Sequence, residues 1–239
     1  MKREHRHRWL PVISLALLAA CASSSTNAPT PQEGAQFPLR VLAPLPQSGK
    51  IYHIDAKASS LHILVYRGGR LANLGHNHVI SSQTISGSIW QGAGVDPSGF
   101  EMTVLVNELI VDDDAARAAE GEDFPLNVTD DAKSGTRTNM LRETLLDGAR
   151  FPVISIRSIS HQGDTDGAQI VAALRIKDQI REISVPVTLR TMDGGLRVKG
   201  QFDIKQTDFG ITPLNVALGA LLVQDTLKIK FDLFALAQE

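Results

Sequence analysis

The sequence predicts an all-β domain of about eight antiparallel strands with one short helical insertion. Apolar and polar residues alternate along most of residues 181–236, and turn sequences such as "RGGR", "VDPSG", "QGDTDG" and "MDGG" separate the alternating runs. Successive side chains of a strand point to opposite faces, so alternation is typical of antiparallel strands with one buried face. Many strands with tight connections and little helix favour a closed barrel or a sandwich.

Residues 1–20 are predicted to be an export signal. Four basic residues precede an apolar run from Leu10 to Ala20, which is too short for a membrane-spanning helix. Leu18-Ala19-Ala20-Cys21 resembles the lipobox of bacterial lipoproteins, in which the cysteine is lipidated after cleavage. The alternative is a plain secretory signal with an incidental cysteine. Because Cys21 is the only cysteine in the chain, we favour lipidation.

Residues 21–48 are predicted to be the lipidated cysteine and a flexible tether, since they are rich in Ser, Thr, Pro and Ala. The folded domain is expected at 49–239. Ala22 stands where inner-membrane retention favours aspartate, which indicates a lipid-anchored envelope protein at the outer membrane, facing the periplasm. Removing residues 1–20 shifts the formal net charge from −2 to −5 and leaves no basic patch, so nucleic-acid binding is not expected.

Nine runs in the domain are predicted as strands. In 225–236, for example, Leu227 and Ile229 alternate with Lys228 and Lys230. The other runs are 51–55, 60–67, 84–91, 100–107, 153–160, 169–177, 181–190 and 195–205.

The helical insertion is expected within 130–152. Ser134 is a possible N-cap, Leu141 and Leu145 form an i,i+4 apolar pair, and "DG" at 147–148 is a stop signal.

Two further segments depart from alternation. The acidic run 112–123 lacks the spacing of a calcium loop, so we expect a solvated loop with a short helical turn. The apolar segment 211–223 contains Pro and Gly and lacks clean periodicity. It is either a loop folded over an opening of the barrel or a mobile apolar gate.

The stretch "LANLGHNHVI" places His76 and His78 two residues apart at the start of a possible strand. Side chains at i and i+2 of a strand share a face. Such a pair could begin a metal site, completed in space by His62, Glu101 or Asp208, or could line the polar end of a pocket. Zinc needs three or four ligands, and a strand histidine is more often a wall residue, so we expect pocket lining and no metal.

The sequence favours a protein that is not an enzyme. It contains no Gly-x-Ser-x-Gly elbow, no H-E-x-x-H pair and no Gly-rich phosphate loop between a strand and a helix.

Four segments together resemble the YceI-like family: "IYHIDAKASSLHILVYR", "SGTRTNMLRETLLDGARFPVISIRS", "LRIKDQIREISVPVTLR" and "IKQTDFGI". They occur in the family's order, and the resemblance runs from Tyr52 to about Ala235. It implies an elongated antiparallel β-barrel, lipocalin-like, whose apolar lumen binds a polyisoprenoid chain. Family ligands are isoprenoid quinones and prenyl phosphates, so such a lipid is the one bound cofactor that we expect.

The family motifs and the histidines together define the expected ligand-binding residues: His62, His76, His78, Arg137, Met140, Leu141, Asp208 and Phe209. Thr138 and Met140 stand where the family usually has Asp and His, and Gln206 stands where it has Arg. The missing positive charge favours a neutral head group, such as a quinone, or a plain lipid tail over a pyrophosphate.

The predicted function is therefore that of a periplasm-facing lipoprotein that binds a long apolar ligand in its barrel. Its expected partners are the membrane, through the N-terminal lipid, and the apolar ligand; a homodimer is left open. The alternative is a structural or stress-related envelope protein with a filled core and no ligand.

Overall fold

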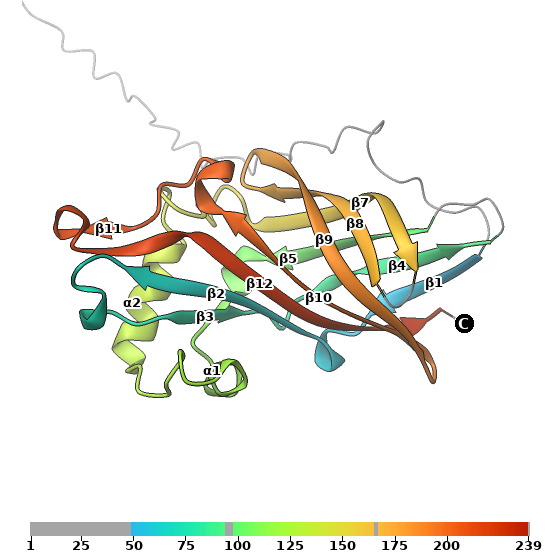
Figure 1. Ribbon diagram of the computed structural model, residues 1–239, viewed down its shortest axis with the longest axis horizontal. Helices are drawn as coiled ribbons and strands as arrows, with labels where there is room; N and C mark the ends of the chain where they lie inside the picture. Colours follow the sequence, from blue (N-terminus) through green and yellow to red (C-terminus); the bar gives the residue numbers. More distant parts are fainter. Residues whose placement is uncertain (1–48, 94–97, 165–166, 239) are drawn as a thin grey trace, which may run out of the picture. The chain divides into compact units, whose positions relative to one another are not determined.

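The structure is a computed structural model that describes residues 49–93, 98–164 and 167–238 (Figure 1). The chain divides into Met1–Thr30 and Pro31–Glu239, and every described residue belongs to the second unit. The predicted export signal, Cys21 and the tether up to residue 48 lie outside the described residues. Neither of the two described α-helices is long and apolar enough to cross a bilayer.

The strands form one antiparallel sheet that closes on itself. They are β1 (Gly49–Ile54), β2 (Ser60–Gly68), β3 (His78–Ser81), β4 (Ser86–Gly92), β5 (Gly99–Leu105), β6 (Ile110–Val111), β7 (Val153–Asp164), β8 (Gly167–Ile176), β9 (Gln179–Met192), β10 (Gly195–Lys205), β11 (Asn215–Val216) and β12 (Leu221–Ala237). Eight of them, β1, β4, β5, β7, β8, β9, β10 and β12, pair in that order, and β12 pairs with β1. The predicted antiparallel barrel of about eight strands is confirmed.

Three further strands extend this ring. β2 pairs with β12 and β3, and β3 pairs with β6. Short breaks in the chain separate β1 from β2, β3 from β4 and β5 from β6. Each of these three consecutive pairs therefore behaves as one long strand with an interruption. β3 lies where the stretch 71–80 predicted the start of a strand, whereas β6 was not among the predicted strands, because a segment of two residues is too short to show a period of two.

The barrel has two distinct ends. One end, here the α2 end, carries the β2–β3 turn (69–77), helix α2 (Asp130–Met140) and the segment 206–220 (Figure 1). At the opposite end, β9 turns into β10 at residues 193–194, and β1 pairs with the end of β12.

Two helices follow β6, where one insertion was predicted. Thr129 caps α2 by accepting a hydrogen bond from Ala132 N, so the prediction of Ser134 as the cap is wrong; Ser134 lies inside the helix. Asp130 and Asp131 occupy the first turn, where the helix dipole favours acidic residues. Residues 141–150 form turns beyond the helix end.

Helix α1 (Asp114–Glu120) lies where a short helical turn was predicted in the acidic run, but burial of Asp112, Ala116 and Arg117 corrects the prediction that this run is solvated. Its Ala116, together with Phe124, packs against Leu64 and Val79 on the outer face of β2 and β3. The acidic residues hid this apolar contact, because the helix is too short to show an amphipathic pattern.

The apolar segment 211–223 is not one long loop. It contains β11, which pairs with Leu221 and Leu222 of β12 as a short hairpin. Ile211 is buried in the main apolar cluster, which agrees with a segment that covers an opening of the barrel. The other interpretation, that 211–223 is a mobile apolar gate, stays a prediction.

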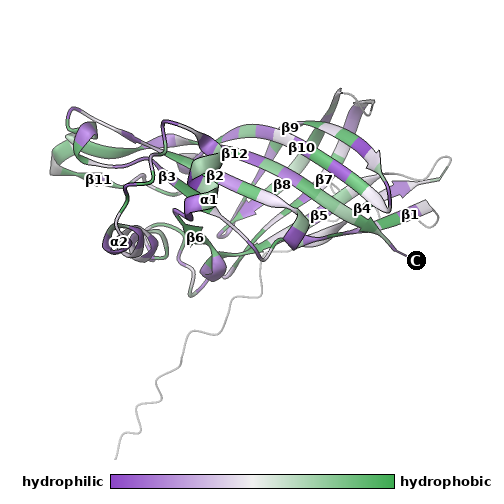
Figure 2. Cartoon of the chain, turned by 90° about the horizontal axis from the view of Figure 1, so that it is seen from below, coloured by the Kyte–Doolittle hydropathy of each residue, from purple (hydrophilic) through white to green (hydrophobic). Residues whose placement is uncertain are grey.

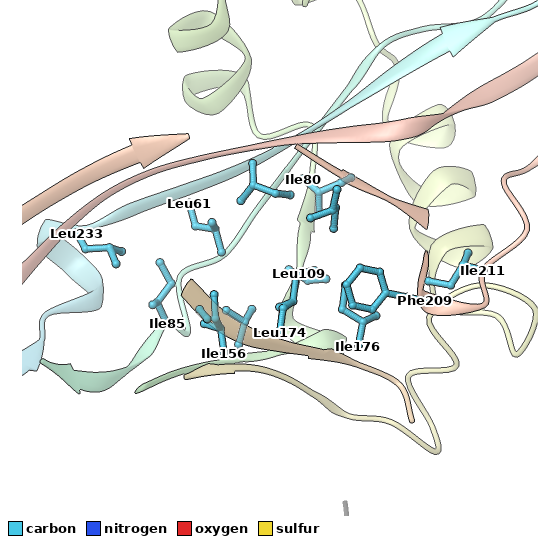
Figure 3. Packing of buried hydrophobic residues seen from close by; sticks show 14 of the residues in the cluster. Leu61, Ile80, Ile85, Leu109, Ile156, Leu174, Ile176, Phe209, Ile211 and Leu233 are labelled. Carbon is cyan, nitrogen blue, oxygen red and sulfur yellow. The ribbon is translucent and has the colours of Figure 1, made fainter. Parts of the chain in front are cut away.

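The interior follows the predicted alternation, visible as alternating colours along the wall strands (Figure 2). Side chains from β2, β3, β7, β8 and β12 and from residues 209–211 converge on the main cluster (Figure 3). A second cluster includes Tyr52, Leu196 and Ala235. The barrel strands and both clusters lie within Pro31–Glu239, so this unit contains what a β-barrel needs to fold on its own.

Candidate functional site

The barrel encloses a cavity of about 480 Å³, within the usual range for small-molecule sites. Its lining is mostly aliphatic and comes from nearly every wall strand and from α2. The wall residues from β12 include Leu227, Ile229, Phe231 and Leu233, the residues that alternation along 225–236 assigned to the inner face.

A glycine in β10 shapes the middle of the cavity. Gly200 lies between Val198 and Phe202, which both line the cavity. A Cβ atom at Gly200 would lie 2.4 Å from the backbone oxygen of Pro186 and 2.5 Å from Cζ of Phe231, so the glycine leaves room for the neighbouring strand β9 and for that ring.

Few polar side chains reach the cavity. They are His78, Gln91, Ser98, Thr136, Asn139, Ser158, His161 and Gln206. Among the described residues, none of the lining side chains is a lysine, arginine, aspartate or glutamate.

His78 is the cavity residue with a charged partner behind it. Its Nδ1 lies 2.6 Å from Oδ2 of Asp112, a fully buried carboxylate. The other oxygen of Asp112 accepts a hydrogen bond of 2.9 Å from Val79 N. Because an ionised carboxylate only accepts, Nδ1 of His78 carries the proton, and Nε2 remains for another partner.

Arg117 of α1 completes this buried cluster. Its Nη1 donates to Oδ1 of Asp112 at 2.5 Å and to Asn77 O at 2.8 Å. Its Nε and Nη2 donate to Pro125 O at 2.9 and 2.6 Å. The guanidinium is fully buried, so it fixes Asp112, and through Asp112 the ring of His78.

The pKa of Asp112 reflects these contacts. Burial raises the pKa. Hydrogen bonds from His78, Val79 N and Arg117, together with the charge at His78, lower the pKa by more than burial raises it, so it lies below the ordinary carboxyl value. Asp112 is therefore ionised at neutral pH.

A lowered folded-state pKa stabilises the protein above the unfolded-state pKa, near 4, and this contribution is lost as the pH falls through the folded-state value. We expect the difference in free energy of unfolding between wild type and Asp112→Asn to be large at pH 5, where Asp112 is ionised in both the folded and the unfolded state. It should shrink below about pH 4. Urea titrations of both proteins at several pH values measure it; a difference unchanged down to pH 3 would contradict the assignment.

The structure brings three of the predicted ligand-binding residues to the cavity: His78, Met140 and Phe209. Met140 is the last residue of α2, and Phe209 ends η5 (Gln206–Phe209). Whether they touch a ligand stays a prediction.

Five of the predicted residues do not line this cavity. His76 precedes β3, so the i,i+2 argument for the histidine pair does not apply, although the two imidazole centroids are only 6.3 Å apart. His62 lies on the outer face of β2, where Nδ1 is 2.7 Å from Oε1 of Glu120.

The other three lie around the α2 end. The guanidinium of Arg137 donates to Asn107 O. Leu141 follows α2 and lies beside Gly148, and Asp208 is exposed in η5. Helix and turn side chains of one motif point in several directions, so sharing a sequence segment does not place them in one site.

Sequence reasoning missed Asp112 and Arg117. One signal was present: Arg117 is the only basic residue in the acidic run 112–123. Within the ranges that the structure describes, no group of three His, Cys, Asp or Glu side chains is arranged as a metal site.

A family model and one solved structure with a TM-score above 0.5 agree with this architecture. The model of the YceI-like domain matches residues 52–235. The crystal structure of Burkholderia cenocepacia BcnA has a TM-score of 0.54 and 16% identity, covering 76% of this chain and 99% of that one. That of a Campylobacter jejuni YCEI protein has a TM-score of 0.47 and 11% identity, covering 67% and 85%. A comparison with curated protein sequences gave no match.

Proposed function

Because this chain belongs to the YceI-like family, we propose that its barrel binds one long apolar molecule of the polyisoprenoid or quinone type. The observation that carries the proposal is the 480 Å³ cavity, walled by aliphatic side chains and provided with one anchored imidazole. The protein acts as a binding protein without catalysis. Cys21 is its lipid anchor, and the barrel faces the periplasm from the outer membrane.

The binding free energy comes mainly from the tail. Burial of apolar surface contributes roughly 25 cal/mol per Å², so a tail that buries about 300 Å² gains on the order of 7 kcal/mol before the entropic costs of association. The cavity itself argues against the alternative of an envelope protein with a filled core.

The head group is neutral. No lysine or arginine of the described chain lines the cavity, so a pyrophosphate would enter without a compensating charge. Because Nδ1 of His78 is engaged with Asp112, Nε2 is the ring atom that can form a hydrogen bond with the head group.

The proposal is tested with Pro31–Glu239, exported under a cleavable signal and purified without detergent. Native mass spectrometry should detect one bound lipid per chain, and added isoprenoid quinone should raise the melting temperature of the emptied protein. Protein that is empty as purified and is not stabilised by quinone refutes the proposal.

His78→Ala should weaken quinone binding about two- to tenfold, because one hydrogen bond to the head group is lost. Binding of a prenyl hydrocarbon without a head group should not change. His76→Ala is the matched control, since that neighbouring imidazole does not line the cavity. Fluorescence titration with both ligands measures the effects; an equal loss for both ligands would exclude a head-group contact.

A further inference from the structure

An exposed apolar patch lies at the α2 end of the barrel. Two segments carry it: the β2–β3 turn and the region of the β11–β12 hairpin. We call the set the tip patch: Leu71, Leu74, Leu214, Val216 and Leu218. Leu74 is 68% exposed and Leu218 is completely exposed.

The two segments lie side by side. The N–H of Leu71 donates to Ala220 O at 2.7 Å, and Gly68 pairs with Leu222 in the β2–β12 ladder. On the hairpin side, Val223 N donates to Leu214 O at 2.8 Å. Backbone hydrogen bonds therefore hold the two segments of the tip patch together, and β11 and the β2–β3 turn are seen at the same end in Figure 1.

Leu218 has an unfavourable backbone conformation and an unfavourably exposed side chain. It has φ of 54°, in the left-handed region that glycine and asparagine tolerate better than leucine, and its side chain faces only water. Sparsely populated backbone conformations of this kind cluster at functional sites.

Two arginines lie in the segments that carry the tip patch. Residues 66–78 and 209–224 contain Arg67 and Arg70 but no aspartate or glutamate, while Asp208 and Asp225 flank the second segment. The guanidinium of Arg67 donates to Gly75 O inside the β2–β3 turn, which keeps this charge beside the leucines. Apolar side chains flanked by arginines fit the boundary between acyl chains and anionic headgroups.

The tip patch is continuous with the cavity. Leu214 belongs to both, because it lines the cavity and is 37% exposed. Val65, Gln206 and Val223 line the cavity at the same end. A surface in contact with the tip patch would therefore lie next to the cavity.

We propose that the tip patch docks the barrel on an anionic lipid bilayer, so that an apolar ligand passes between the membrane and the cavity without crossing water. This deepens the proposed function, on which it rests only for the identity of the cargo. An anchor at Cys21 is compatible with this orientation, because residues 22–48 can span up to about 90 Å.

Flotation of Pro31–Glu239 with vesicles tests the proposal. We expect the protein to float with vesicles of equal parts phosphatidylethanolamine and phosphatidylglycerol, and much less with pure phosphatidylcholine. The double variant Leu74→Ser, Leu218→Ser should lower the partition coefficient roughly tenfold, because two inserted side chains are lost. It should not lower the melting temperature, since both leucines are exposed.

The matched control is Leu126→Ser, Met192→Ser, which removes two exposed apolar side chains outside the tip patch and should float like wild type. Absence of flotation, equal loss in both double variants, or equal flotation with phosphatidylcholine overturns the proposal. So does a dimer, seen by light scattering, that the Leu74/Leu218 variant abolishes while flotation persists. The vesicles contain no prenyl lipid, so docking and ligand binding can fail separately.

Discussion

Replacing Asp112 with alanine should lower the free energy of unfolding by about 3–5 kcal/mol, the largest effect on stability that we expect from a single substitution here. The change leaves the guanidinium of Arg117 buried without its counter-charge, and it also removes the acceptors of His78 and Val79 N. Urea unfolding at pH 7 measures the loss. Because Asp112 has φ of 56°, alanine adds some backbone strain.

Asp112→Asn separates the two causes. Asparagine tolerates the left-handed conformation and keeps one acceptor, so it should retain part of the stability. The matched control is Asp114→Ala, two residues away, which breaks the exposed ion pair with Lys133 and should have little measurable effect. If both alanine variants lost the same free energy, the buried cluster would not have the structural role described above.

Ile170→Trp should reduce binding of the apolar ligand by more than about a hundredfold, the largest effect on binding that we expect. Ile170 of β8 lines the cavity and packs against both apolar clusters, so it lies where the two clusters meet. An indole at this position would occupy the middle of the lumen and leave no continuous space for a long chain.

The protein should still fold, because the added bulk enters a cavity and not a filled core. Ile170→Leu, which keeps the volume, is the control and should bind like wild type. Native mass spectrometry of the purified variants gives the fraction with bound lipid, and circular dichroism reports the melting temperature. A tryptophan variant that carries as much lipid as wild type would place the ligand outside the lumen.

The fold was predictable because its main signal is local. The run 195–205 predicted β10 with the observed bounds, and alternation in 225–236 identified the residues that face the cavity. The alternation of apolar and polar residues involves only neighbours in the chain, so it can be recognised without knowing which strands pair.

The polar part of the site was not predictable in the same way. The buried cluster combines residues from three different elements: His78 of β3, Arg117 of α1 and Asp112 from the connection before α1. In the sequence, these charged residues resemble those of a solvated surface. The histidine pair illustrates the same limit: one strand boundary decides that His78 lines the cavity and His76 does not.

The pairing of β12 determines when the barrel can form. This strand pairs with β10, β11, β2 and β1, so the C-terminal residues join the two edges of an otherwise open sheet. During synthesis, β12 emerges after the other strands of the barrel, and the edges that it joins stay unpaired until then. The closing contacts therefore join strands that are far apart in the sequence, such as β1 and β12, and contacts of this kind slow folding and leave the open sheet exposed to aggregation.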